Sequence, residues 1–510
     1  MLEILDTTLR DGEKTAGVSF IASEKLAIAQ LLLEELRVDR IEVASARVSK
    51  GESDAFSRIC EWAASKGYLD RVEVLGFVDG GISVDWIVMG GGKVINILAK
   101  GSLKHLSTQL RKTTQEHIAD IAEVVRYARS KGLTCNIYLE DWSHGIIESP
   151  EYVFELMDGL KSLDIRHFML PDTLGILDPW STSEMCWKML RRYPELNFDF
   201  HAHNDYGFAV ANTMSAVRAG CTGVHTTVNG LGERSGNASV AAVVASLSDM
   251  MPVKMRVDET KLTHVCKYVE SISGIRIPDN APVVGENVFT QTSGVHADGD
   301  RKGSLYANQL LPERFGRVRQ YALGKMSGKA NIIENLDKLG ISLSPEQVKL
   351  VTQRVVELGD KKEMMTAEDL PFIVADVLKG DHSTSDNIKI VNYSLQLTKG
   401  MKPAAMLKVS IDGTEYESSS NGDGQYNAFM KALWKIYDKL GKKHPLLADY
   451  MVSIPPGGKT DALVATTIVW NMDGHEFKTR GIDSDQTEAA IKATVKMLNI
   501  IENLDITNLR

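Results

Sequence analysis

Eight short runs rich in Val, Ile, Leu and Phe alternate with longer stretches of helical periodicity in the first half of the chain. The runs are 2–6, 40–45, 71–78, 94–100, 134–141, 167–173, 197–205 and 223–230. Such alternation is typical of repeated βα units around a parallel sheet. Eight units in roughly 260 residues match the size of a (β/α)8 barrel, and the first run lacks the GxGxxG motif of a dinucleotide-binding sheet. We therefore expect an α/β chain that begins with a (β/α)8 TIM barrel.

Composition and charge exclude several classes of partner. With 58 Lys and Arg against 67 Asp and Glu, the formal net charge of −9 gives no general attraction to nucleic acid or to anionic lipid. The five cysteines are widely spaced and never form CxxC, so we expect neither a disulfide framework nor a thiolate metal site. The chain has no apolar run near the ~18 residues of a membrane span and no basic-then-apolar leader. We expect a cytoplasmic protein with no membrane or nucleic-acid partner.

Polar side chains gather where the expected strands end, which is the active face of a (β/α)8 barrel. His201 and His203 lie two residues apart near the end of the seventh run, so both imidazoles point to the same side. Asp11 follows the first run, which barrel closure brings beside the eighth run and close to the seventh. Two imidazoles and a carboxylate suit a divalent ion such as Zn or Mn, with Mg as a further option. The alternative is that each histidine only satisfies a polar barrel mouth.

Three segments together resemble a known superfamily. They are DTTLRDGE at 6–13, HAHND at 201–205 and NGLGERSGN at 229–237. They are similar to the DRE-TIM metallolyases and, among these, to the Claisen-type acyltransferases: the 2-isopropylmalate, citramalate and homocitrate synthases. Related hydroxymethylglutaryl-CoA lyases carry a catalytic cysteine in the loop after the eighth strand. This chain has Glu233 and Arg234 there, which favours the synthase branch.

The resemblance implies a metal-dependent condensation of acetyl-CoA with an α-keto acid. It implies that Arg10 assists the reacting carbonyl or enolate and that Thr173 binds the keto-acid carboxylate. The residues that it implies for the divalent metal ion are Asp11, His201 and His203 as ligands, with Asn237 in or next to the ligand shell.

The condensation also needs a base that removes a methyl proton and a group that stabilises the enolate. Arg10 can serve as the stabilising group. Candidates for proton transfer are Glu140 on the fifth run and, outside the barrel, His296 and Tyr306. The segment with His296 and Tyr306 resembles the family's accessory region, whose His and Tyr reach a partner subunit's barrel; without the resemblance it equally fits a Gly-rich surface loop. The base stays open among Glu140, His296 and a bound water.

Two other functions compete with the synthase. A Schiff-base aldolase needs a lysine buried at a strand end, and Lys100 is the tempting position, although we expect it to be solvated or to face a helix. A non-catalytic amino-acid sensor would not need the complete set of residues at the barrel mouth.

Side-chain size near the strand ends indicates which keto acid fits. The residues concerned are Leu75 and Phe77 on the third run, Leu98 on the fourth and Tyr138 on the fifth. They are large and so favour pyruvate over 2-ketoisovalerate, although such residues also fill ordinary barrel interiors. The overall likeness to citramalate synthases agrees, and the alternative is a 2-isopropylmalate synthase.

The last third of the chain contains an internal repeat. Asp412–Tyr416 matches Asp473–Phe477 at an offset of 61, because 474 − 413 = 61. Each unit predicts strands, a DG hairpin turn and an amphipathic helix, which implies a pseudo-twofold α+β module. Residues 266–380 read as mostly helical, with Ser344 as a helix cap, and 379–386 as a linker. We therefore expect a catalytic barrel at 1–265, helical accessory subdomains at 266–385 and a regulatory domain at 386–510.

The C-terminal module resembles the family's regulatory domain, which binds the end-product amino acid. Candidate contacts are Pro456, Gly457, Gly458 and Asp461, since the glycines allow close approach of the backbone to a ligand. A turn that only aids dimerisation is equally compatible. Isoleucine is the expected inhibitor of a pyruvate-using enzyme and leucine that of a ketoisovalerate-using one. We expect a homodimer.

Overall fold

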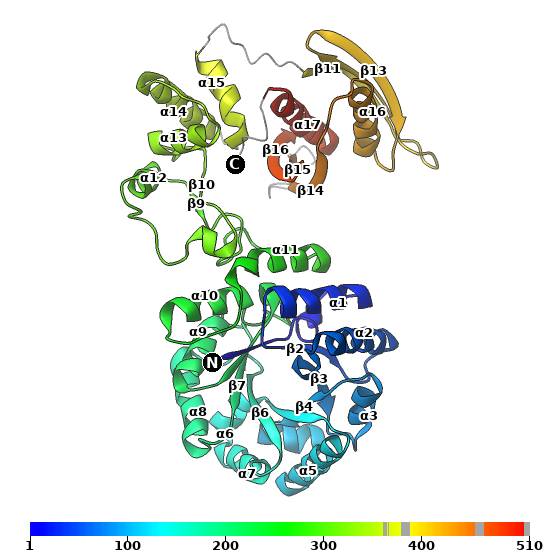
Figure 1. Cartoon of the computed structure of the whole chain (residues 1–510), viewed down its shortest axis with the longest axis vertical. Helices are drawn as coiled ribbons and strands as arrows, with labels where there is room; N and C mark the ends of the chain where they lie inside the picture. The colour runs from blue at the N-terminus through cyan, green and yellow to red at the C-terminus, as the bar shows by residue number, and fades with distance from the viewer. Residues whose placement is uncertain (361–364, 366, 379–387, 454–463, 504–510) are drawn as a thin grey trace. The chain divides into compact units, whose positions relative to one another are not determined.

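The computed structural model describes residues 1–360, 365, 367–378, 388–453 and 464–503, and it divides into two compact units (Figure 1). The first comprises Met1–Phe289 and Asn308–Val318. The second comprises Thr290–Ala307 and the chain from Arg319 onward.

Eight parallel strands of the first unit pair in sequence order and close into a barrel, as predicted. They are β1 (Glu3–Asp6), β2 (Arg40–Ser45), β3 (Val72–Phe77), β4 (Val94–Lys100), β5 (Thr134–Glu140), β6 (Ile165–Asp172), β7 (Phe198–Ala202) and β8 (Gly223–Thr226). Closure pairs β1 with both β2 and β8.

Helices surround the strands on the outside of the barrel (Figure 1). They are α1 (Ala22–Gln30), α2 (Lys50–Lys66), α3 (Ile82–Met89), α4 (Leu103–His105), α5 (Thr114–Ser130), α6 (Trp142–Glu148), α7 (Pro150–Leu160), α8 (Pro179–Arg192), α9 (Ala209–Ala219), α10 (Val240–Met250) and α11 (Leu262–Ser273). Their apolar faces and the outward faces of the strands form one large core.

The seventh and eighth strands end earlier than predicted. After β8 the chain turns at Asn229 and Gly230, whose φ angles of 58° and 69° are incompatible with a strand. The loop then returns to β7, where His203 and Asn237 form an isolated bridge. Gly236 is required there, because a Cβ would lie 1.9 Å from the Gly230 carbonyl oxygen. The loop after β8 is thereby held against the segment at the end of β7 that carries both histidines.

The second unit contains small parallel strands β9 (Thr290–Gln291) and β10 (Gln320–Tyr321) and helices α12 (Gly294–Arg301), α13 (Lys329–Lys338), α14 (Pro345–Asp360) and α15 (Leu370–Leu378). Ser344 caps α14 as predicted, since its hydroxyl accepts a hydrogen bond from the Gln347 amide at 3.3 Å. The expected linker at 379–386 lies outside the described residues.

The predicted α+β repeat is confirmed. One antiparallel sheet contains β11 (Ile388–Gln396), β12 (Ala404–Ile411) and β13 (Thr414–Asn421), with helix α16 (Gln425–Lys439); the other contains β14 (Leu446–Ser453), β15 (Val464–Met472) and β16 (His475–Asp483), with helix α17 (Gln486–Asn503). Both DG turns have two residues at positive φ, at 49° and 79° for Asp412 and Gly413 and at 52° and 89° for Asp473 and Gly474. Two positive φ angles define the type I′ hairpin turn.

Among the described residues, no helix is both long enough and apolar enough to span a membrane.

The barrel interior is charged at one end. Arg40 on β2 is buried and donates hydrogen bonds to Glu73 on β3 at 3.1 Å and to Asp199 on β7 at 2.5 Å. Glu3 on β1 lies 3.0 Å from the same guanidinium. A buried charge is tolerated only when it is paired and hydrogen-bonded. The buried Arg40 guanidinium and its carboxylate partners therefore stabilise each other in the folded barrel.

Arg40→Met should therefore destabilise the barrel by about 3–5 kcal/mol, because it leaves buried carboxylates without a counter-charge. The midpoint of thermal unfolding measures the effect. Arg129→Met is the matched control, because Arg129 forms an exposed ion pair with Asp164 and should contribute no more than about 1 kcal/mol. Equal midpoints for the two variants would contradict a stabilising role for the Arg40 cluster.

Candidate active site

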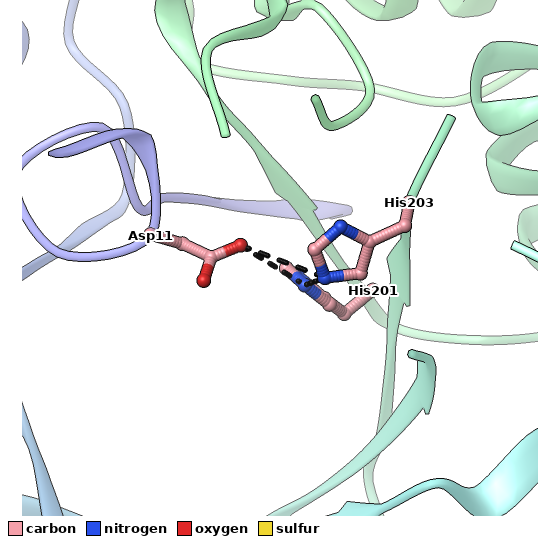
Figure 2. Close-up of side chains that lie close together, drawn as sticks. All are labelled: Asp11, His201 and His203. Carbon is pink, nitrogen blue, oxygen red and sulfur yellow. Dashed lines mark hydrogen bonds and ion pairs between the residues drawn. The ribbon is translucent and has the colours of Figure 1, made fainter. Parts of the chain in front are cut away.

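Three predicted metal ligands meet at the barrel mouth (Figure 2). Asp11 lies in the turn after β1, His201 in β7 and His203 just beyond its end. Asp11 Oδ2 lies 3.6 Å from His201 Nε2 and 3.7 Å from His203 Nε2, and the two Nε2 atoms are 3.4 Å apart. All three side chains are buried.

This spacing fits a cation. Metal–nitrogen distances near 2.0–2.1 Å with tetrahedral angles place two ligand atoms about 3.4 Å apart. Asn237 lies beside the three residues and donates to Asp11 Oδ2 at 2.9 Å, while its own Oδ1 is buried without a hydrogen-bond partner among the described residues. The buried Asn237 Oδ1 and the two Nε2 atoms lie on the side of Asp11 away from its cationic partners, and a divalent ion would supply positive charge on that side.

The two oxygens of Asp11 have different neighbours. Oδ2 faces the histidines, whereas Oδ1 accepts from Arg10 Nη1 at 2.6 Å and lies 3.0 Å from Lys14 Nζ. Burial alone would raise the pKa of Asp11, but the Arg10 guanidinium beside it holds that pKa well below its usual range. The carboxylate is therefore ionised at neutral pH.

The histidines are in the form that binds metals. Burial, reinforced by the neighbouring His201, lowers the pKa of His203 to about 3, and burial also lowers the pKa of His201. Both imidazoles are neutral at pH 7. Together with ionised Asp11 they form a donor set with one negative charge.

Arg10 is held from two sides. Its Nε donates to Glu42 Oε2 at 2.7 Å, and its Nη2 donates to the Tyr138 hydroxyl at 3.2 Å. Burial opposes the charged form, but Glu42 and Asp11 raise the pKa of Arg10 above its ordinary value. The guanidinium is therefore a permanent cation with a defined orientation.

Lys100 differs from the expectation that it is solvated or faces a helix. It is buried and forms an ion pair with Glu140, its partner in the register of β4 and β5. The expectation was wrong because the register of β4 and β5, which the sequence does not give, places Glu140 directly beside Lys100. The Glu140 carboxylate, a candidate for proton transfer, thus already has an ammonium partner.

Thr173 lies where β6 ends and takes part in a loop network. Its hydroxyl accepts a hydrogen bond from the Asp141 amide at 2.9 Å, which leaves the hydroxyl proton available to an acceptor. Its carbonyl accepts from Arg234 at 2.8 Å, and Arg234 also donates to Asp205 at 2.7 Å. Arg234 therefore ties the loop after β8 to the ends of β6 and β7.

The predicted pocket residues lie near one another. Leu75 and Tyr138 belong to an apolar cluster inside the barrel, with Leu98 packed against it. Sequence inspection missed Leu5 and Met169, which are fully buried in the same cluster. Phe77, two residues beyond Leu75, is half-buried.

The other candidate residues lie elsewhere. His296 and Tyr306 belong to the second unit, where their ring centroids are 4.2 Å apart and both side chains are exposed. The structure brings these two together but does not place them relative to the barrel mouth. The regulatory candidates, Pro456, Gly457, Gly458 and Asp461, lie outside the described residues.

Three contributors to the site were missed in the sequence. They are Glu42, which binds Arg10, Lys14, which binds Asp11, and His225 on β8, whose Nδ1 lies 3.1 Å from the Tyr138 hydroxyl. For Glu42 and His225 the available signal was an ionisable residue in the middle of a barrel strand.

The chain matches three family models in succession. They are HMGL-like at residues 1–269, homocitrate synthase post-HMGL domain-like at 283–363 and LeuA allosteric (dimerisation) domain at 364–502. The closed barrel, the candidate metal cluster at its mouth and the family matches together place the chain among the DRE-TIM proteins, in agreement with the resemblance in the sequence. The first model covers more than half of the chain, which therefore belongs to the HMGL-like family.

Curated relatives match over most of the chain. A putative (R)-citramalate synthase of Methanopyrus kandleri is 36% identical, over 91% of this chain and 88% of its own length. A probable 2-isopropylmalate synthase of the same organism is 33% identical over 98% of each. The (R)-citramalate synthase of Methanocaldococcus jannaschii is 31% identical over 99% of this chain and 100% of its own length.

Asp6, at the end of β1, should make stability depend on pH. It is buried, with one oxygen bound to the Thr8 amide and the other without a hydrogen-bond partner in the described part of the chain, and burial raises its pKa to about 7. The folded chain then binds the proton more tightly than the unfolded chain. This contribution is complete below about pH 4 and is lost as the pH rises through about 7.

The thermal midpoint of the wild-type protein minus that of Asp6→Asn should therefore decrease as the pH is raised from 4 to 8. The control is Asp70→Asn, at an exposed aspartate, measured over the same pH range. A constant difference for Asp6→Asn would show that Asp6 does not titrate between the folded and unfolded states.

Added Mn²⁺ or Zn²⁺ should raise the thermal midpoint, because a ligand that binds only the folded chain stabilises it by about 2.7 kcal/mol at a hundredfold excess over its Kd. Asp11→Asn should remove most of this shift. Glu233→Gln is the matched control, since Glu233 is 59% exposed in the loop after β8 and lies outside the ligand cluster. A shift that survives in Asp11→Asn would place metal binding elsewhere.

Proposed function

We propose that this protein is an acyltransferase that condenses acetyl-CoA with an α-keto acid, and that the keto acid is pyruvate and the product citramalate. The observation that carries the proposal is the convergence of Asp11, His201 and His203 beside a fixed Arg10. The names of the full-length relatives support the reaction class.

Asp11, His201 and His203 are the residues that would hold the divalent ion, Zn or Mn with Mg as a further option, and Asn237 lies next to them. The bound ion would act as a Lewis acid toward the keto and carboxylate oxygens of the substrate. Thr173 has a hydroxyl proton to offer to the substrate carboxylate, because its oxygen already accepts from Asp141.

Arg10 supplies fixed positive charge near the reacting atoms. Enolate formation from acetyl-CoA develops negative charge on the thioester oxygen, and a preorganised guanidinium stabilises it without reorganisation. Glu42 and Asp11 hold the guanidinium in place before substrate binds. The group that removes the methyl proton stays open among Glu140, His296 and a water. The accessory segment with His296 and Tyr306 is proposed to serve the barrel of a second copy in a homodimer.

The filled cluster around Leu75 and Tyr138 supports the smaller acceptor. A methyl side chain needs less space than an isopropyl group. The side chains of Leu75, Tyr138 and Leu98 are large and occupy space inside the barrel, which favours the smaller group. The alternative is a 2-isopropylmalate synthase that uses 2-ketoisovalerate, the activity in the name of one relative.

We also propose a catalytic barrel at 1–265, an accessory region at 266–385 and a regulatory domain at 386–510. The match of residues 364–502 to the LeuA allosteric (dimerisation) domain supports feedback inhibition. Isoleucine is the proposed inhibitor if pyruvate is the substrate, and leucine if 2-ketoisovalerate is.

Release of CoA from acetyl-CoA with each keto acid tests the proposal. We expect kcat/KM for pyruvate to exceed that for 2-ketoisovalerate at least about tenfold, since each methylene contributes ~1–3 kcal/mol to discrimination. Leu75→Ala should narrow the ratio by enlarging the pocket.

The matched control is Val74→Ala, because Val74 is also buried on β3 but packs in the outer core. It should leave the ratio unchanged. A preference for 2-ketoisovalerate would reverse the substrate assignment, and no CoA release with either acid would reject the synthase.

A further inference from the structure

A hydrogen-bonded chain runs through the barrel interior from Arg40 to Arg10. Asp199 Oδ2 accepts from Arg40 and lies 3.4 Å from His225 Nε2. His225 Nδ1 lies 3.1 Å from the Tyr138 hydroxyl, which accepts from Arg10 at 3.2 Å. Every member of this chain is buried.

Each proton in the chain can be assigned from its neighbours. Asp199 is an ionised acceptor beside Arg40, so the ring nitrogen that faces it, Nε2 of His225, carries the hydrogen. A neutral imidazole has one N–H, and Nδ1 is therefore an acceptor. The Tyr138 hydroxyl then donates to His225 Nδ1 and presents its lone pairs to Arg10.

This assignment matters because Tyr138 has a second acceptor within reach. Glu42 Oε2 lies 3.2 Å from the Tyr138 hydroxyl, and the same oxygen accepts from Arg10 Nε at 2.7 Å. Arg10 Nη2 also lies 2.6 Å from Glu42 Oε2, so two nitrogens of the guanidinium already face the two lone pairs of that oxygen. A hydrogen bond from the Tyr138 hydroxyl would therefore compete with Arg10. His225 directs the phenolic proton away from Glu42.

We propose that His225 is a positioning residue for the condensation. By accepting a hydrogen bond from the Tyr138 hydroxyl, it keeps that hydroxyl from donating to Glu42, so that Glu42 binds Arg10 alone and fixes the guanidinium. The inference rests on the proposed function, because it assigns Arg10 to the reacting atoms. In this proposal His225 acts on Arg10 through Tyr138; its ring also lies edge-on to that of His201, with centroids 5.3 Å apart, so the metal content of each variant is measured together with its rate.

His225→Leu removes the acceptor and should lower kcat roughly tenfold, as expected for one buried hydrogen bond, with KM unchanged because Arg10 acts on charge that develops during the reaction. His225→Asn supplies an amide oxygen near the position of Nδ1 and should restore most of the rate. Tyr138→Phe in the His225→Leu background should cause no further loss and should recover part of the rate, because it removes the hydroxyl that competes for Glu42.

His167→Leu is the matched control. His167 Nδ1 lies 3.1 Å from the other oxygen of Asp199, and this buried histidine has no recorded contact with Tyr138 among the described residues. Its loss should lower the thermal midpoint but leave kcat within about twofold of wild type. An equal fall in kcat for His167→Leu and His225→Leu would reduce His225 to a structural role and overturn the inference, as would multiplicative effects of His225→Leu and Tyr138→Phe.

Nitrogen-15 spectra of histidine-labelled wild-type protein give a readout that needs no stable leucine variant. With the His225 signals identified by comparison with His225→Asn, we expect Nε2 to be protonated and Nδ1 not. A protonated Nδ1 overturns the inference. Inactive wild-type protein would reject the proposed function itself, whereas active wild-type protein matched by His225→Leu would reject this inference alone.

Discussion

The Asp11 carboxylate is the group on which the site depends, because its two oxygens face two different sets of neighbours. Oδ1 meets Arg10 and Lys14, and Oδ2 meets the two neutral histidines. The cations keep the carboxylate ionised in a buried position, so that it can bind a metal ion. Barrel closure makes this arrangement possible, because β8 pairs with both β1 and β7 and brings the Asp11 turn to His201.

The barrel interior pairs most of its charges. Arg40 with its carboxylates lies at one end and Arg10 with Glu42 and Asp11 at the other, and the side chains of Asp199, His225 and Tyr138 connect the two arginines. An apolar cluster around Leu75 lies in the same interior and is the proposed contact for the substrate side chain. The interior therefore combines fixed dipoles and charges with an apolar surface, as a site for enolate chemistry requires.

Much of the fold could be predicted because it depends on local patterns. Alternation of strand and helix predicted the barrel, and the DG turns at Asp412 and Asp473 predicted the C-terminal repeat. The HxH spacing and Asp11 predicted a metal site at the barrel mouth, and the structure brings these three side chains together. Roles that depend on a partner from another strand were not predictable in this way. The role of Glu42 depends on its contact with Arg10, which only the three-dimensional structure shows. The burial of Lys100 likewise depends on Glu140, which the strand register places beside it.

Anomalous diffraction from crystals of the full chain grown with Mn²⁺ tests the central claim most directly. The account predicts a manganese peak bounded by Asp11 Oδ2 and the Nε2 atoms of His201 and His203. The absence of a peak at this position, with the three side chains ordered, would contradict it.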